Sequence, residues 1–321
     1  MSHLKDKKSV LALAIFSIAF ILISGCVSMP PSLHASPVAS TNETPTPHMS
    51  VPASVSASAP GPAPSSTDLV VYYIDVGQGD SELIQYGGKN MLIDAGPTVA
   101  GSRVSKFLKA HGVSSIDVLV STHPHEDHIG GMLTVLNDFP VKVVYDSGRP
   151  HTTQTYEQYL TLIDKKNIKY VVPEAGDIID FAPGVKVQVL SAGVDSDDLN
   201  EQSIVMKVAY GDTSFLFTGD IGFDAESSLL KSGYNLKSDV LKVGHHGSRH
   251  SSGTSFLKAV DPKYSVIEVG ADNSYNHPSK QALGRLQAAG STVYRTDYDG
   301  TVEAASDGKG VIMSAERRAP A

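Results

Sequence analysis

One short loop, rich in histidine and placed directly after a buried strand, constrains the fold of this chain more than any other feature. Residues 117–121 (DVLVS) form an apolar run, and residues 122–128 (THPHEDH) follow it with three histidines and one aspartate. Rigid scaffolds present chemical groups at the ends of strands. Imidazole and carboxylate are ligands that suit Zn²⁺, Mn²⁺ or Fe²⁺. The chain is therefore expected to build a sheet with a metal centre at a strand end.

The spacing within this loop divides its side chains into two groups. His123 and His125 lie two residues apart and can point into one site. Asp127 and His128 fall where the loop turns into a helix, so they can face a second site. The alternative, a solvated polar loop, fits this density of ligand residues poorly. The loop thus predicts one or two divalent metal ions.

The rest of the chain repeats one arrangement of strands and helices. In each half, strand-like runs joined by glycine turns come first, and strands alternating with helical patterns follow. This order predicts two β-rich layers covered by helices. The expected strands are 69–75, 82–85, 91–94, 117–121, 141–145, 169–172, 185–190, 203–209, 214–218, 239–243, 264–268 and 292–295. The expected helices are 101–111, 129–137, 154–165, 224–231, 254–259 and 278–288.

Three further motifs end strands in the same way. Asp94 ends the strand 91–94, Asp220 ends a hairpin strand within FTGD (217–220), and KVGHHGS (242–248) ends another strand. Together with the HxHxDH loop, these motifs resemble the metallo-β-lactamase superfamily, which implies an α+β fold, a four-layer αββα sandwich. DVGQGDS (75–81) and YNHPS (275–279) make the chain similar to the metallo-β-lactamase domain of DNA-uptake proteins of the ComEC type. The resemblance covers about residues 70–312.

The resemblance also implies which residues bind the metals. The ligand set is His123, His125 and Asp220 for one Zn²⁺ or Mn²⁺ ion, and Asp127, His128, Asp220 and His245 for the other. Two cations would stabilise a hydroxide near neutral pH, and that hydroxide would attack the substrate. The predicted catalytic residues are Asp127, Asp94 and His277. Asp94 is expected to orient a ligand imidazole.

Several assignments stay open at this point. Spacing alone does not separate His245 from His246, and His245 is favoured because the superfamily's ligand directly follows the strand and a glycine. His246 is then the alternative ligand or a hydrogen-bond donor beside the ligands. His277 is either a general acid, a phosphate contact or only a helix-start residue. The other candidates for supporting ligands or contacting substrate are Ser248, Gln78, Asp80 and Asn200, although tight-turn chemistry also explains Gln78 and Asp80.

The segment before the FTGD hairpin departs from many enzymes of this superfamily. Residues 198–203 (DLNEQS) hold no histidine, although many members have a further ligand there. Domains of the ComEC type similarly have asparagine and serine. The first metal would therefore have fewer protein ligands, and Asn200 or Ser203 would contact the substrate instead. His151 is expected to lie on a surface loop.

The first 67 residues are typical of targeting and spacing segments. Lysines precede an apolar run at 10–23, whose 14 residues give about 21 Å of helix, short of the roughly 30 Å of a bilayer core. ISGC (23–26) resembles a lipobox, and Cys26 is the only cysteine. We expect residues 1–26 to be a lipoprotein signal peptide with lipid attachment at Cys26. An uncleaved membrane anchor is the alternative.

A spacer and one hydrolase domain are expected to follow. Residues 27–67 hold nine of the 18 prolines and one charged residue, so they predict a disordered spacer. Residues 68–315 are expected to form a metallo-β-lactamase-like hydrolase domain. The lipid anchor would hold this domain outside the cytoplasm, at the outer face of the cell membrane.

Charge and cysteine content limit the function. A single cysteine excludes an internal disulfide and a Cys-rich zinc site. The chain carries a net charge of −8; three lysines and one aspartate in the leader and one glutamate in the spacer leave −9 on the remaining residues. This acidity argues against tight non-specific binding of DNA. The sequence therefore predicts a metal-dependent phosphodiesterase or nuclease, with a phosphodiester, DNA included, as substrate. The alternatives are a hydrolase of a phosphocholine-type ester, a lactone or a β-lactam, and a non-catalytic surface binding lipoprotein.

Overall fold

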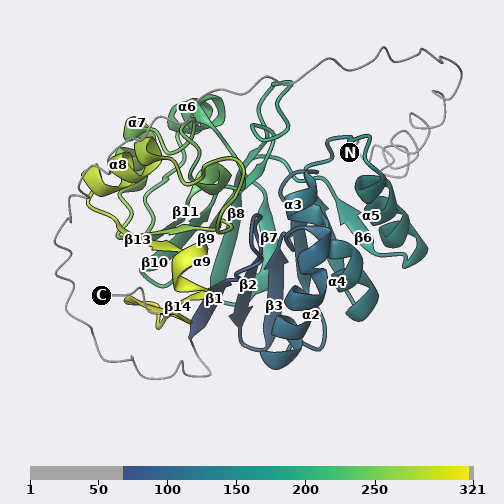
Figure 1. The fold of residues 1–321 in the computed structure, drawn as a ribbon. Coiled ribbons are helices and arrows are strands. Elements are labelled where there is room, and N and C mark those ends of the chain that lie inside the picture. Colours follow the sequence, from purple (N-terminus) through teal and green to yellow (C-terminus); the bar gives the residue numbers. More distant parts are fainter. Residues whose placement is uncertain (1–67, 318–321) are drawn as a thin grey trace, which may run out of the picture. The chain divides into compact units, whose positions relative to one another are not determined.

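The computed structural model describes residues 68–317 (Figure 1). The predicted signal peptide (1–26), its lipid attachment at Cys26 and the predicted spacer (27–67) lie outside the described residues. Among residues 68–317, no helix is both long enough and apolar enough to cross a membrane.

Two sheets form the centre of the described region. The eight-stranded sheet has the order β15 (Val311–Ala315), β14 (Val302–Ser306), β1 (Leu69–Tyr73), β2 (Glu82–Tyr86), β3 (Lys89–Ile93), β4 (Val118–Ser121), β5 (Val143–Asp146) and β6 (Lys169–Val171). The seven-stranded sheet has the order β13 (Thr292–Arg295), β12 (Tyr264–Ile267), β11 (Val240–Lys242), β10 (Thr213–Phe217), β9 (Ile204–Tyr210), β8 (Val185–Ala192) and β7 (Ile178–Ala182).

Helices cover the outer faces of both sheets (Figure 1). The helices beside the first sheet are η1 (Thr98–Ala100), α2 (Gly101–Ala110), α3 (Glu126–Ile129), α4 (Met132–Asp138) and α5 (Gln154–Lys165). Those on the second are α6 (Phe223–Lys231), α7 (Thr254–Val260) and α8 (Lys280–Ala288), while η2 (Gly244–Gly247) and α9 (Thr296–Asp299) follow β11 and β13. Apolar side chains of α6, α7 and α8 share one buried cluster with Leu216, Leu241 and Ile267 of the second sheet. The layers run helix, sheet, sheet, helix, which confirms the predicted αββα sandwich.

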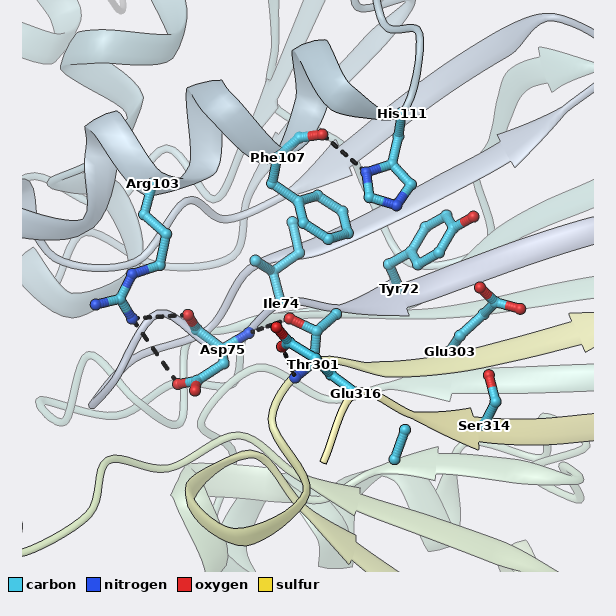
Figure 2. Close-up of a pocket in the computed structure, with 11 residues that line it drawn as sticks. Tyr72, Ile74, Asp75, Arg103, Phe107, His111, Thr301, Glu303, Ser314 and Glu316 are labelled. Carbon is cyan, nitrogen blue, oxygen red and sulfur yellow. Dashed lines mark hydrogen bonds and ion pairs between the residues drawn. The ribbon is translucent and has the colours of Figure 1, made fainter. Parts of the chain in front are cut away.

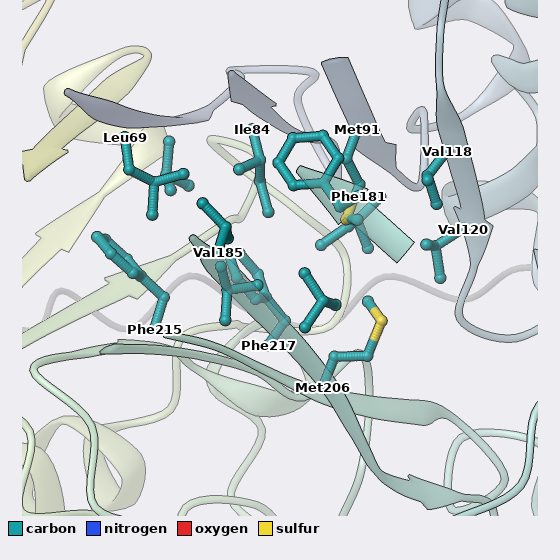
Figure 3. Close-up of a cluster of buried hydrophobic side chains, with 14 of the residues drawn as sticks. Leu69, Ile84, Met91, Val118, Val120, Phe181, Val185, Met206, Phe215 and Phe217 are labelled. Atoms are coloured by element: carbon teal, nitrogen blue, oxygen red, sulfur yellow. The ribbon is translucent and has the colours of Figure 1, made fainter. Parts of the chain in front are cut away.

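The core between the sheets follows from alternation along the strands. Successive side chains of a strand point to opposite faces. Leu69, Val71 and Tyr73 of β1 therefore enter the same buried cluster as Phe215 and Phe217 of β10. Figure 3 shows side chains from both sheets meeting in this space. The shared core fixes one sheet against the other, and so fixes where their strand ends lie.

Each sheet combines an antiparallel part with a parallel part. β1, β2 and β3 are antiparallel, as are β8, β9 and β10, whereas β3 to β6 and β10 to β13 run parallel. Ligands bind outside the carboxyl ends of parallel strands in sheets of this kind. The residues that follow β3, β4, β10 and β11 are the ones that this arrangement brings together.

Four of the differences between the observed and the expected elements concern whole strands or helix boundaries. Sequence patterning misses β7, which pairs with β8, and the hairpin β14–β15. β14 pairs with β1 from the other end of the domain, and local periodicity does not reveal such a partner. The expected helix 129–137 is divided into α3 and α4 at Gly130 and Gly131. The expected helix 278–288 begins at Lys280, because the hydroxyl of Ser279 accepts a hydrogen bond from the Ala282 amide at 3.1 Å and caps it.

Candidate metal centre

Asp94 connects the ends of two neighbouring parallel strands. It follows β3 with a positive φ of 52°, which turns its carboxylate toward the residues after β4. The Thr122 amide donates to Oδ1 of Asp94 at 2.9 Å, and the Thr122 hydroxyl donates to Oδ2 at 2.6 Å. Nδ1 of His128 lies 2.7 Å from the same Oδ2. Asp94 therefore fixes the ring of His128 and leaves Nε2 of that ring directed elsewhere, as expected for a residue that orients a ligand.

Two glycines bring the backbone close beneath the histidine loop. A Cβ on Gly131 would lie 2.0 Å from the carbonyl oxygen of Ala95, and a Cβ on Gly79 would lie 2.3 Å from that of Asp127. The Ala95 amide donates to the carbonyl oxygen of His128 at 2.8 Å. Because only glycine fits these contacts, the backbone of the loop packs directly against the segments that contain Gly79 and Ala95.

The first two histidines of the loop lie against each other. Nε2 of His123 is 3.0 Å from Nδ1 of His125, and His123 is fully buried. Nδ1 of His123 faces the hydroxyls of Thr122 at 3.1 Å and Ser203 at 3.3 Å. Burial, with the charges of His128 and His125 as further causes, lowers the pKa of His123 well below its usual value, although Asp220 and Asp127 oppose this. A neutral imidazole is the form that binds metal.

Asp220 stands at the centre of the cluster. It follows β10, and its amide donates to the hydroxyl of Ser203 at 3.1 Å. Its Oδ2 lies 3.4 Å from Nε2 of His128 and 3.3 Å from Nε2 of His246. Ligand atoms of His123, His128 and Asp220 all lie within 4.8 Å of one another. Asp220 therefore lies where a carboxylate shared by two groups of ligands would lie.

The neighbouring histidines after β11 point to different places. Both have left-handed backbone, with φ of 49° at His245 and 51° at His246, so the chain turns sharply between them. His246 is buried, and its Nε2 lies 3.4 Å from Oδ2 of Asp127. The side chain of His245 is 31% exposed, and its Nε2 lies 4.0 Å from Asp220. The structure thus brings His246 rather than the favoured His245 among the other candidate ligands.

The other ring nitrogen of His246, Nδ1, also has partners that orient the ring. Its Nδ1 lies 2.9 Å from the backbone carbonyl oxygen of Glu268 and 3.3 Å from Oδ1 of Asp80. A proton on Nδ1 donates to the Glu268 carbonyl oxygen and leaves Nε2 free to face Asp127 and Asp220, whereas Oδ1 of Asp80 makes no hydrogen bond within residues 68–317. Asp80 also lies 3.7 Å from Nδ1 of His128. The DVGQGDS turn, for which tight-turn chemistry is the alternative explanation, thus places a carboxylate behind two candidate ligands.

The cluster rests on a buried lysine that the sequence reasoning misses. Lys242 is fully buried, contacts Asp80, donates to the carbonyl oxygen of Gly219 at 2.9 Å and lies 3.7 Å from Oδ1 of Asp220. Burial would lower its pKa, but the surrounding carboxylates, Asp80 first, raise the pKa of Lys242 well above its usual value. The only signal in the sequence is a lysine inside an otherwise apolar strand.

Two buried carboxyl groups near Lys242, those of Glu268 and Glu82, are also absent from the candidates found in the sequence. Burial, and then Asp80, raises the pKa of Glu268 to about 8, although Lys242 opposes this. Burial and the neighbouring Glu268 raise the pKa of Glu82 well above its usual value. The raised pKa values favour the neutral form of both side chains, which reduces the negative charge beneath the cluster.

The charges and donors of the cluster fit a divalent cation. Burial would raise the pKa of Asp220, but His246 and His128 hold it well below its usual range. Burial opposes a charge on the rings of His128 and His246, but Asp220 and Asp80 raise the pKa of both well above its usual value, so a divalent ion would take the place of two ring protons. Within residues 68–317, Nε2 of His128, Nε2 of His246 and Oδ1 of Asp220 are buried and make no hydrogen bond. One or two metal ions would compensate the charges of the carboxylates and engage these atoms.

The family model of the metallo-beta-lactamase superfamily matches residues 74–270. The chain belongs to the metallo-β-lactamase superfamily. The matched range contains the HxHxDH loop, Asp94, Asp220 and both neighbouring histidines, whereas His277 lies beyond it. The predicted family is confirmed. The fold of this superfamily typically binds one or two divalent metals, and the cluster contains groups of residues that could hold such an ion.

Three relatives share parts of this metallo-β-lactamase domain. ComE operon protein 3 of Bacillus subtilis (strain 168) is 32% identical over 258 residues, which cover 74% of this chain and 33% of that protein. Competence protein ComA of Neisseria gonorrhoeae is 34% identical over 234 residues, covering 71% and 31%. Ribonuclease Z of Clostridioides difficile (strain 630) is 31% identical over 103 residues, covering 32% and 29%. The predicted similarity to competence proteins is confirmed, and the chain spans about a third of the length of these relatives.

A hollow of about 370 Å³ opens onto the metallo-β-lactamase cluster. Its walls include three predicted residues from separate segments, Gln78, Asn200 and His277. Burial, and then the charges of His245 and His246, lowers the pKa of His277 to about 4. His151, expected on a surface loop, also lines this hollow, with its ring 5.8 Å from that of His125.

The predicted candidates fall into a central set and a peripheral set. The central set is His123, His125, Asp127, His128, Asp220 and His246, supported by Asp94 and Asp80. Ser248 and His245 lie at the edge, where both line a second hollow of about 710 Å³. A further hollow of about 650 Å³ lies between α2 and β14; Figure 2 shows its lining, and none of the predicted site residues is part of it.

Proposed function

We propose that this chain is an exported, lipid-anchored phosphodiesterase that uses one or two divalent metal ions and acts on nucleic acid. The observation that carries the proposal is the Asp220 carboxylate, which faces Nε2 of His128 at 3.4 Å and Nε2 of His246 at 3.3 Å. Oδ2 of Asp127 also faces Nε2 of His246, at 3.4 Å. A hollow of about 370 Å³, lined by Asp127 and Asp220, gives a substrate access to these side chains. This supports a site where a substrate phosphate meets metal ligands.

Some residues of such a site would bind the metal ions, and others orient these ligands. The ligands would be His123, His125 and Asp220 for one ion, and Asp127, His128, Asp220 and His246 for the other, with His246 in place of His245. When bound, divalent ions lower the pKa of water and neutralise charge on a phosphodiester. Asp94 and the carbonyl of Glu268 fix the imidazoles of His128 and His246 through their Nδ1 atoms.

The substrate would meet the remaining polar groups of the hollow. Oδ1 of Asn200, Nε2 of Gln78 and Nδ1 of His277 are buried and make no hydrogen bond within residues 68–317. All three side chains line the hollow. Such groups cost free energy unless a ligand satisfies them, so they favour a polar substrate.

The relatives support the choice of a phosphodiester. The name ribonuclease Z describes an enzyme that cleaves RNA, and two further relatives are named as competence or ComE operon proteins. The metallo-β-lactamase fold hosts many reactions, so this support concerns the bond type and not the whole activity.

A substrate panel tests the proposal on the full-length protein purified in detergent. The panel is bis-p-nitrophenyl phosphate, single-stranded DNA, a phosphomonoester and nitrocefin, each with Zn²⁺ or Mn²⁺. Turnover of the first two, lost on chelation and restored by metal, supports a phosphodiesterase. Turnover of nitrocefin alone points to a β-lactamase, and no turnover with any substrate points to a binding lipoprotein.

Metal content separates the two neighbouring histidines. His246→Ala is expected to lower the bound metal per chain and to abolish turnover, because His246 lies among the other ligands. His245→Ala is expected to keep its metal. His111→Ala is the matched control, since this histidine lines the distant hollow of Figure 2. Loss of metal in His245→Ala with full metal in His246→Ala would overturn the ligand assignment.

The membrane anchor is tested separately. Cells that express the full chain are labelled with radioactive palmitate, and the protein is recovered from membrane and soluble fractions. Label on the wild type and none on Cys26→Ser, with the variant released from the membrane, is the expected result. Label that persists in Cys26→Ser contradicts attachment at that cysteine.

A further inference from the structure

A second hollow continues outward from the metal cluster. It has a volume of about 710 Å³ and lies between the segment after η2 and the start of α8. The 370 Å³ hollow at the cluster and this larger one, called the outer groove below, share His245, Tyr275 and His277 in their walls. A substrate that reaches the cluster therefore extends naturally into the outer groove.

The lining of the outer groove is basic, although the domain is acidic. No aspartate or glutamate lines it, and Arg249 and Lys280 stand exposed on its walls. The side chain of Lys280 makes no hydrogen bond or ion pair in the described part of the chain, and Nε of Arg249 donates to Nε2 of its neighbour His250 at 2.9 Å. Lys280 also opens the nine-residue α8, whose positive end lies here. The groove thus offers two available cations to an anion.

Aromatic rings form a continuous path from the cluster into the outer groove. The ring of His277 lies 5.7 Å from that of His245, and the ring of Tyr275 is stacked on His277 at 5.8 Å with an interplanar angle of 28°. Tyr275 is 64% exposed, so part of its ring is open to solvent. Its free face is available for a flat ring of the substrate.

The loop that carries Tyr275 is held in place before any ligand arrives. Oδ1 of Asn273 accepts hydrogen bonds from the amides of Tyr275 at 3.1 Å and His277 at 3.0 Å. Its Nδ2 donates to the carbonyl oxygens of His277 at 2.6 Å and Gly270 at 2.9 Å. A preorganised platform loses little entropy on binding, so a stacked ring gains affinity there.

We propose that the outer groove binds the nucleotide next to the reacting phosphodiester, with its base stacked on Tyr275 and its phosphate between Arg249 and Lys280. This inference rests on the proposed phosphodiesterase function. It assigns a substrate with at least one nucleotide beyond the reacting phosphodiester, in a single strand, because a base inside a duplex is already stacked on both faces and cannot stack on Tyr275. Base stacking on an aromatic side chain tolerates any base. The groove would therefore select single strands over duplexes without preferring a base sequence.

The test compares a long and a short substrate on the full-length protein. Turnover of a fluorescent single-stranded DNA 12-mer and of bis-p-nitrophenyl phosphate is measured for the wild type, Tyr275→Ala and Lys280→Gln. Loss of stacking is expected to raise KM for the 12-mer about 5- to 150-fold in Tyr275→Ala. The loss for the 12-mer exceeds the loss for the small diester by at least about fivefold. Tyr275→Phe, which keeps the ring, restores the 12-mer.

Binding without turnover gives an independent readout. Fluorescence anisotropy of the labelled 12-mer in EDTA is measured against salt concentration. Lys280→Gln is expected to reduce the slope of log affinity against log salt by about 0.7, the value for one phosphate contact of a single strand. The matched controls are Tyr298→Ala, a tyrosine 60% exposed on α9, and Lys258→Gln, exposed on α7. Both lie outside the groove and keep the wild-type slope and KM.

The outcomes distinguish the inference from the function on which it rests. No turnover of either substrate by the wild type overturns the phosphodiesterase proposal itself. Turnover of both substrates with Tyr275→Ala and Lys280→Gln equal to the controls overturns only the outer groove. Turnover of the small diester without the 12-mer overturns it as well. Thermal unfolding of each variant identifies any loss that comes from misfolding.

Discussion

Lys242 is the side chain whose removal gives the sharpest test of the buried charge network. Its ammonium is fully buried, contacts Asp80 and lies 3.7 Å from Oδ1 of Asp220, and these two carboxylates are themselves 1% and 4% exposed. Lys242→Met keeps the length of the side chain and deletes the charge. Asp80 then remains in a space of low dielectric constant without its nearest cation, with only the rings of His246 and His128 facing it.

The expected cost follows from these contacts. Removal of one partner from a buried ion pair costs about 3–5 kcal/mol, because the other charge is left uncompensated. The carbonyl oxygen of Gly219 also loses a donor at 2.9 Å, and an unsatisfied buried acceptor costs about 1–3 kcal/mol. Methionine returns part of this by filling the space. We expect Lys242→Met to lower the free energy of unfolding by about 4 kcal/mol or more in chelator.

Urea denaturation followed by circular dichroism, in EDTA, measures this change. Lys237→Met is the matched control, because Lys237 pairs with Asp261 at 2.9 Å with both side chains more than half exposed. An exposed pair of this kind contributes little to stability. A double-mutant cycle with Asp80→Asn completes the design. The coupling energy between Lys242 and Asp80 is expected to be about 2 kcal/mol or more.

The reasoning is refuted by a small or generic effect. If Lys242→Met loses less than about 1.5 kcal/mol, or no more than Lys237→Met, the lysine does not compensate the buried carboxylates. A coupling energy near zero would show that the cost arises from packing and not from the pair.

Three further predictions concern residues that are not candidate metal ligands. Burial raises the pKa of Glu226 to about 7 from 4.5, so its stabilising contribution is present below pH 4.5 and is lost as the pH rises through 7; Glu226→Gln is expected to remove this loss when unfolding is compared at pH 5 and pH 8. Gly131→Ala places a Cβ 2.0 Å from the carbonyl of Ala95, and we expect a loss of about 2 kcal/mol or more by urea denaturation, with wild-type stability as the contradicting result. Gly284→Ala meets nothing within 4 Å on α8 and should raise the unfolding free energy by about 0.5–1 kcal/mol; a lower value would mean that this glycine has a contact role.

Local patterns in the sequence predict the parts of the site that one short segment determines. The HxHxDH loop after β4 and Asp220 after β10 could both be located, because an apolar strand followed by polar residues marks a strand end. The two β-rich layers covered by helices could also be predicted, because hairpins and strands alternating with helices each leave a local pattern in the sequence. The resemblance to a known superfamily added which strand ends meet.

Features that depend on distant contacts could not be predicted. Lys242 looks like an ordinary lysine until β11 is placed beside Asp80, which lies far away along the chain. His245 and His246 are equivalent in sequence, and only the left-handed backbone at both residues decides which ring enters the cluster. β14 was missed because its partner is β1, and its short sequence alternates only weakly between apolar and polar residues.

The structure also separates two residues that the sequence left as equal candidates for substrate contact. The Ser203 hydroxyl accepts from the amide of Asp220 at 3.1 Å and lies 3.3 Å from Nδ1 of His123, so its hydrogen bonds hold two ligands in place. Oδ1 of Asn200 is buried, makes no hydrogen bond within residues 68–317 and lies on a residue that lines the hollow. Because a buried acceptor without a donor is costly, the geometry favours Asn200 for the substrate and Ser203 for the metal ligands. The segment without a histidine therefore supports the site in two different ways.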